Sequence, residues 1–243
     1  MKSAEPKKPM KEMMADCTLA TKKDFRFEDQ LLRNIAGINI ELFVLLSECG
    51  IRNRLQLAVI TLTVKNFRLL QCINDCIFNG YYEVGMTLLR VLYENLLLMQ
   101  YFINNENEAG KWLKGKKFRA GFIRSKVMGK SEFYSFVSDY YIHANLESLV
   151  PVIESFTDQD ISLILYPGYS REKCALGLSL SIIYGWLNNL HLQYAFRQYL
   201  WEDEAWKKGF IGWNEVMIRY MDEKLINRSA IRSEFAEKIP EPM

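Results

Sequence analysis

The sequence predicts an all-α protein, folded as a single helical bundle of six or seven helices. Apolar residues recur at spacings of three and four along most of the chain, and the periodic segments stop at glycine or asparagine. No linker or internal repeat interrupts the middle of the chain. The exception is a small irregular or hairpin excursion expected near residues 150–169, where short β-branched runs stand beside Pro151 and Pro167.

The elements follow in order along the chain. Residues 1–23 are rich in lysine, contain two prolines and lack periodicity, which predicts a mobile N-terminal tail. The helical bundle domain is expected over residues 24–228, and a polar C-terminal tail over residues 229–243. Within the domain the pattern predicts helices over residues 24–50, 54–78, 83–103, 106–129, a short helix capped by Ser131, then 171–201 and 204–225.

Composition excludes several classes of protein. The net charge is only +2, from 31 basic and 29 acidic residues, so a nucleic-acid footprint over the whole surface is not expected, although a local basic patch is compatible with this balance. Five cysteines, no signal peptide and no disulfide-dense pattern indicate reduced thiols in the cytoplasm. Cys72 and Cys76 are four residues apart but lack partner ligands, so buried thiols are expected there, and no metal or cofactor.

One charge-free run has the length of a membrane span, from Cys174 to Phe196. It contains Asn188, Asn189 and His191, and the chain has no second comparable run. We therefore expect a buried core helix and no membrane association. Small residues in this run form a line that would let another helix approach closely: Gly177, Ser181 and Gly185.

The helix expected over residues 83–103 carries one narrow polar stripe, formed by Glu83, Thr87, Arg90 and Glu94. At 100° per residue these four positions fall within about 60° of arc, and nearly every other position is apolar. In one interpretation the stripe faces solvent, and Arg90 and Glu94 form a pair that stabilises the helix by roughly 0.2–0.5 kcal/mol. In the other, it faces an internal cleft, where paired charges have perturbed pKa values and carry function.

Only two histidines exist, His143 and His191, and no nucleotide-binding or hydrolase motif is present. Chemistry that needs several imidazoles is nearly excluded. His143 ends a short segment that also contains Ser138 and Asn145, where a helix C-terminus favours the imidazolium and suits a general acid or a cap. The alternative is a structural histidine bonded to a local carbonyl. For His191 we expect a core or interface histidine.

Two stretches together resemble a family of helical proteins from bacteria and archaea. They are "NGYYEVGMTLLRVLYENLLLMQYFI" and "EAGKWLKGKKFRAGFIR", followed by "YSFVSDYYIHANLES". In that family an "LLRxxxE" helix precedes a tryptophan helix and a serine-to-histidine segment. The family is in turn similar to the HEPN domains, many of which are RNA-cleaving toxins or phage-defence effectors. The resemblance covers roughly residues 60–148.

The resemblance implies site residues at matching positions. They are Arg90, Glu94, Trp112, Ser138, His143 and Asn145. In our own hypothesis Arg90, Glu94 and His143 are catalytic, and Trp112, Ser138 and Asn145 bind a ligand together with Thr87 of the stripe. The arginine–histidine motif of HEPN ribonucleases is absent, so a ribonuclease site here would have to pair Arg90 with His143 across helices.

Two functions follow as hypotheses. In the first, the protein is a toxin or antiviral effector that acts on RNA, a nucleotide or another phosphate-containing ligand. Arg90 would hold a phosphate, and a basic run from Lys111 to Lys126 with interleaved Trp112, Phe118 and Phe122 would contact bases. In the second, it is a non-catalytic binding or oligomerisation module, with Met217 and Met221 on a homodimer face. For the basic run itself, the alternative is a solvated helix whose aromatic residues belong to the core.

Overall fold

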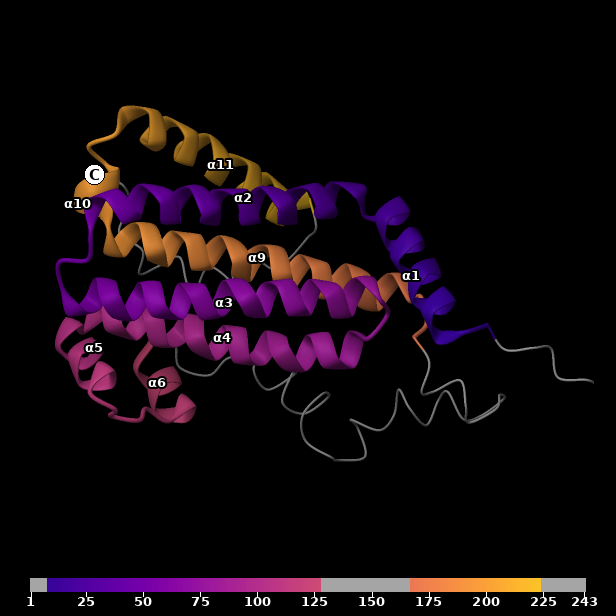
Figure 1. Cartoon of the computed structure of the whole chain (residues 1–243), viewed down its shortest axis with the longest axis horizontal. Helices are drawn as coiled ribbons and strands as arrows, with labels where there is room; N and C mark the ends of the chain where they lie inside the picture. Colours follow the sequence, from indigo (N-terminus) through magenta and orange to yellow (C-terminus); the bar gives the residue numbers. More distant parts are fainter. Residues whose placement is uncertain (1–7, 128–166, 224–243) are drawn as a thin grey trace, which may run out of the picture. The chain divides into compact units, whose positions relative to one another are not determined.

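The computed structural model describes residues 8–127 and 167–223, which form nine helices and no strand. The all-α class is confirmed, with more helices in this part of the chain than the six or seven expected (Figure 1). Of the expected excursion, residues 150–166 lie outside the described residues, and 167–169 have no regular structure. The helices are α1 (Met10–Asp24), α2 (Arg26–Cys49), α3 (Arg54–Phe78), α4 (Tyr82–Asn104), α5 (Glu106–Leu113), α6 (Ala120–Val127), α9 (Arg171–Ala195), α10 (Arg197–Leu200) and α11 (Glu204–Glu223).

The three helices α2, α3 and α4 occupy the residues that periodicity predicted. At the start of α3 the side-chain oxygen of Asn53 accepts the backbone N–H of Gln56 at 2.8 Å, which satisfies one of the helix's free amides. The end of α3 is followed by Gly80 at φ +83, a left-handed conformation that suits glycine. Local chemistry therefore sets these boundaries.

The prediction of a single helix over residues 106–129 is wrong, because the helix is interrupted between α5 and α6. Gly115 adopts φ +93, and its N–H donates to the carbonyl of Trp112 at 2.8 Å. The N–H of Lys116 donates back to the carbonyl of Lys111 at 3.0 Å, which closes the end of α5. The long helix expected to reach residue 201 is likewise interrupted, after Ala195.

The prediction of a mobile tail over residues 1–23 is wrong from Met10 onward, since the chain is helical from there to Asp24. Its residues Cys17 and Thr21 are buried, and Thr18 donates a hydrogen bond to the carbonyl of Phe78 at 3.3 Å. The helix lacks a strong amphipathic pattern, so these few contacts were not visible as periodicity.

The described residues divide into two compact units, and four long helices contribute a part to each. Unit 1 contains α1 and residues 26–37, 66–93 and 167–185. Its core depends on two glycines of α9. A side-chain carbon built on Gly177 would lie 2.7 Å from Cδ1 of Ile77, and one on Gly185 would lie 2.9 Å from Cγ2 of Ile35. The small-residue line predicted in α9 is therefore a site of close packing.

Unit 2 contains residues 38–65, 94–127 and 186–223. Carboxamides hold part of its interior together. The side chain of Asn39 in α2 is hydrogen-bonded to that of Asn189 in α9, and Gln56 in α3 donates to the carbonyl of Ala195 at 3.3 Å. Trp186 donates its ring N–H to Asn214 of α11 at 2.8 Å. Polar pairs thus connect four helices of this unit.

The run from Cys174 to Phe196 is a core helix, as expected, because most of its residues are buried. Among the described helices α2 alone has the length and hydropathy to cross a membrane, and a third of its most apolar window is buried. The burial expected for Cys72 is wrong, since Cys72 is exposed, while Cys76 is half-buried. Both cysteines lie near the end of α3, on the side that the core does not cover completely.

Candidate functional site

The polar stripe of α4 begins at the protein surface. Glu83 and Thr87 are exposed, and both belong to unit 1. The carboxylate of Glu83 accepts a hydrogen bond from Nζ of Lys173 in α9 at 2.8 Å, and the hydroxyl of Thr87 donates to the backbone carbonyl of Glu83 at 2.9 Å. The first half of the stripe thus faces solvent, as one of the two interpretations expected.

The second half of the stripe is half-buried, at Arg90 and Glu94. Arg90 belongs to unit 1 and Glu94 to unit 2. The three residues expected to join them, Ser138, His143 and Asn145, lie outside the described residues. The pairing of Arg90 with His143 therefore stays a prediction.

Trp112 lies in a cluster of aromatic rings in unit 2. Its ring centroid is 5.6 Å from that of Phe102, and Phe118 is 5.8 Å from Phe102 and 5.7 Å from Tyr101. Phe122 meets the edge of Tyr101 at 6.0 Å. These distances are typical of packed aromatic pairs, so Trp112 and Phe118 help to anchor α5 and the connection to α6.

Phe122 differs from the other rings of the cluster because 44% of its surface is exposed. One edge contact with Tyr101 holds it, and Nζ of Lys126 lies 5.9 Å from its ring centroid. Lys126 follows Phe122 by one helical turn on α6, which places the cation beside the ring. The core interpretation of the aromatics is thus supported for Trp112 and Phe118, while Phe122 reaches the surface.

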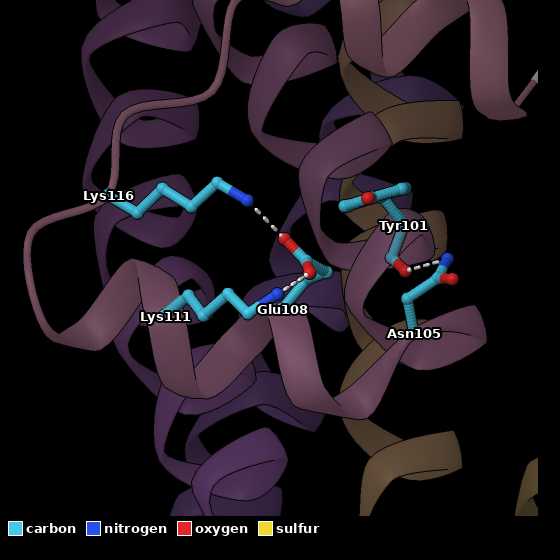
Figure 2. Close-up of polar contacts among 5 residues, drawn as sticks. All are labelled: Tyr101, Asn105, Glu108, Lys111 and Lys116. Carbon is cyan, nitrogen blue, oxygen red and sulfur yellow. Dashed lines mark hydrogen bonds and ion pairs between the residues drawn. The ribbon is translucent and has the colours of Figure 1, made fainter.

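Glu108 fixes the turn between α5 and α6. Its two carboxylate oxygens accept hydrogen bonds from Lys111 at 2.5 Å and from Lys116 at 2.7 Å (Figure 2). The hydrogen bond from Lys111, followed by that from Lys116, lowers the pKa of Glu108. Beside it, Asn105 donates to the carbonyl of Tyr101 at 3.0 Å, where α4 gives way to α5. A single carboxylate therefore holds both lysines across the Gly115 turn.

The four exposed cations of this segment that do not bind Glu108 are Lys114, Lys117, Arg119 and Lys126, and together with Phe122 we call them the basic α5–α6 surface. All four cations are exposed, and the described residues place no carboxylate in an ion pair with any of them. From Lys111 to Lys126 the sequence has seven basic residues and no acidic one. Because the whole chain carries +2, everything outside this segment has a net charge of −5. Positive charge is therefore concentrated on one short segment.

Unit 2 also has a small open pocket of about 230 Å³ that the sequence did not indicate. It lies between the starts of α3 and α5, and its lining comprises Asn53, Arg54, Leu55, Glu106, Asn107 and Gly110. The stem of Arg54 passes 2.9 Å from where a side-chain carbon of Gly110 would stand. The only sequence signal is therefore the glycine itself, which leaves room for the arginine of another helix.

His191 is a structural histidine, as expected. It is buried in unit 2, with Nδ1 2.8 Å from the carbonyl oxygen of Leu187 and Nε2 2.9 Å from the side-chain oxygen of Gln100. Desolvation by burial lowers the pKa of His191 to about 4. In the described part of the chain, no three histidine, cysteine or acidic side chains come together in a way that could hold a metal ion.

Comparison of the chain with protein-family models, with curated proteins and with solved structures found no match. The HEPN-like resemblance therefore stays a prediction, and the geometry of unit 2 is the basis for a functional proposal.

Proposed function

We propose that this protein binds RNA through the basic α5–α6 surface. The observation that carries the proposal is the segregation of charge: seven cations and no acid within sixteen residues of a chain that is otherwise net negative. Such a field attracts polyanions and concentrates them at one place on the surface. Among polyanions the exposed ring favours a single-stranded nucleic acid, because a base can stack on it, and RNA is the one that the HEPN-like resemblance implies.

The arrangement supports an extended ligand. The cations lie on α6 and on the open connection before it, where several phosphates of one strand can be contacted in succession. Arg119 precedes Phe122 by three residues, and Lys126 follows it by four, so both flank the ring along one side of α6. A strand lying across α6 would meet a cation, an aromatic ring and a second cation.

The test is binding of a fluorescently labelled single-stranded RNA, followed by anisotropy at several salt concentrations. We expect the affinity of the unaltered protein to fall steeply as salt rises, because bound phosphates release counterions. The variant K114E/K117E/R119E should bind at least ten-fold more weakly, and its salt slope should be shallower by about 0.7 for each phosphate that the variant no longer neutralises.

The matched control is K11E/K22E/K23E, which changes three exposed lysines of α1 and alters the net charge by the same amount. It should retain most of the affinity. Equal weakening in the two triple variants would mean that only overall charge matters, and the proposal would then be wrong.

We further propose, from the HEPN-like resemblance, that the protein is a cytoplasmic toxin or antiviral effector whose chemistry involves Arg90, Glu94 and His143. Arg90 and Glu94 are each half-buried, and charged groups that are partly withdrawn from water are common at functional sites. Induced expression in bacteria should arrest growth, and R90A and H143A should each remove the arrest without lowering the melting temperature. Loss of folding in both variants would assign these residues to structure instead.

A further inference from the structure

A second surface of unit 2 is apolar at its centre. On the C-terminal half of α2, Ile40 and Val44 are 56% and 58% exposed. On the N-terminal half of α3, Leu57 and Val64 are 41% and 38% exposed. We call this surface the α2–α3 face. Side chains of this size are usually withdrawn from water, and four of them on one hairpin indicate a contact surface.

The two halves of the face are neighbours in the hairpin. Only residues 50–53 separate the end of α2 from the start of α3, and the two helices run in opposite directions, with α9 drawn between them in Figure 1. Both helices also pack on α9, through the hydrogen bond of Asn39 with Asn189 and that of Gln56 with Ala195. The four exposed apolar side chains thus belong to two helices that share α9 as a neighbour and that one short connection joins.

The charges around the face are separated by sign. In unit 2 the exposed charges of α2 are Glu41 and Glu48, which are both acidic and, seven residues apart, lie along one edge of the helix. The exposed charges of the connection and of α3 are all basic, and comprise Arg52, Arg54 and Lys65.

Contacts place two of these cations, Lys65 and Arg54, on the side of α3 that neighbours α4 and α5, while Arg52 lies over the ring of Tyr199 in α10. Lys65 donates to Asn95 of α4 at 3.4 Å, and Arg54 packs against Gly110 of α5. On α2, the helical positions of Glu41 and Glu48 differ from that of Ile40 by about 80–100° of rotation. The apolar centre thus has a basic edge on α3 and an acidic edge on α2.

We infer that the α2–α3 face binds a second copy of this chain. A two-fold axis that runs along the hairpin would place the α2 of each copy over the α3 of the other. The acidic edge of one copy would then meet the basic edge of its partner, while the apolar centres meet each other. One face thus carries both the acidic edge and the basic edge. A surface that binds a second copy of itself needs both, whereas binding an unrelated partner does not require both signs on one surface.

The expected dimer is weak. The exposed strip extends over about two turns of α2 and three turns of α3, or roughly 12–16 Å, which is small for a stable interface. We expect the mass measured by sedimentation equilibrium to rise from 28.5 kDa toward twice that value across the micromolar range. A mass that stays at one chain across this range would overturn the inference.

The first variant removes the apolar centre. I40E/V44E changes two side chains that are mostly exposed in the single chain, so the fold should persist while the protein stays at the mass of one chain. The control L19E/V84E introduces the same charge at two exposed apolar positions of unit 1, 66% and 52% exposed, and should still dimerise. A dimer that survives I40E/V44E would overturn the inference.

The second test exchanges charge. E41K alone and K65E alone should each weaken the dimer by several-fold, because like charges then face each other across the axis. The double variant E41K/K65E restores opposite charges and should regain the dissociation constant of the unaltered protein. Additive weakening in the double variant would exclude this pairing of the two edges.

Discussion

Nζ of Lys116 lies 2.7 Å from Oε2 of Glu108, on the opposite side of the turn that ends α5. Lys111 binds the other oxygen of the same carboxylate, so one acid neutralises part of a segment that has none of its own. The arrangement orders the turn and at the same time reduces the positive charge that faces an incoming anion.

Removing this carboxylate should therefore strengthen RNA binding. In E108Q the amide keeps the shape of the side chain, and Lys111 and Lys116 become available to phosphates. We expect a several-fold gain in affinity and a steeper salt dependence in the anisotropy titration. The melting temperature should change little, because exposed ion pairs contribute little to stability. Weaker binding by E108Q would show that the ordered turn matters more than the added charge.

Phe122 offers a test of base stacking. F122A should lower the affinity for single-stranded RNA about five-fold or more, since the stacking of one base contributes about 1–3 kcal/mol. Its thermal stability should be nearly unchanged, because almost half of the ring is exposed. F118A is the matched comparison: this ring packs on Tyr101 and Phe102, so its removal should reduce stability. If F122A binds RNA as well as the unaltered protein, the ring has no role in recognition.

His191 should make the stability of the protein depend on pH. Burial lowers its pKa when folded, so the unfolded chain binds the proton more readily, and stability is lost as the pH falls from its usual pKa of 6.5 toward about 4. Between about pH 7.5 and pH 5 the contribution amounts to about 2 kcal/mol.

Urea unfolding of the unaltered protein and of H191Q at both values of pH measures this contribution. The glutamine variant cannot be protonated, so its stability should change less between the two values, by about the same 2 kcal/mol. An equal change in both proteins would exclude His191 as its source.

The close packing of α9 in unit 1 predicts that one methyl group added at Gly177 lowers the stability of the protein. G177A would place a carbon 2.7 Å from Cδ1 of Ile77, and should destabilise the protein by about 1–3 kcal/mol. I77V removes that Cδ1, so I77V/G177A should recover part of this stability. G37A, where a side-chain carbon meets nothing within 4 Å, should instead stabilise α2 by about 0.5–1 kcal/mol. Thermal or urea unfolding of the four proteins distinguishes these outcomes.

Periodicity predicted α3 and α4 to within a residue at each end, because their core faces repeat over six turns and glycine or asparagine stands at their ends. It failed at α1 and at the break between α5 and α6. In α1, two buried residues give too weak a pattern, and in the break, Gly115 ends a helix whose apolar residues continue on both sides. Short helices are held by tertiary contacts, which a local pattern does not contain.

For the candidate site, the sequence by itself determined the inventory: the basic run from Lys111 to Lys126, the polar stripe of α4 and a core α9 with a small-residue line. Only the tertiary structure decided how these residues are used. Phe122 is exposed, whereas much of Trp112 is buried. Lys111 and Lys116 bind Glu108, whereas no carboxylate of the described residues forms an ion pair with Lys117. The tertiary structure also buried Met217, which withdraws that side chain from the homodimer face expected there, and left Ile40 and Val44 in solvent. Helical spacing fixes which residues share a side, whereas burial depends on neighbours that are distant in the sequence.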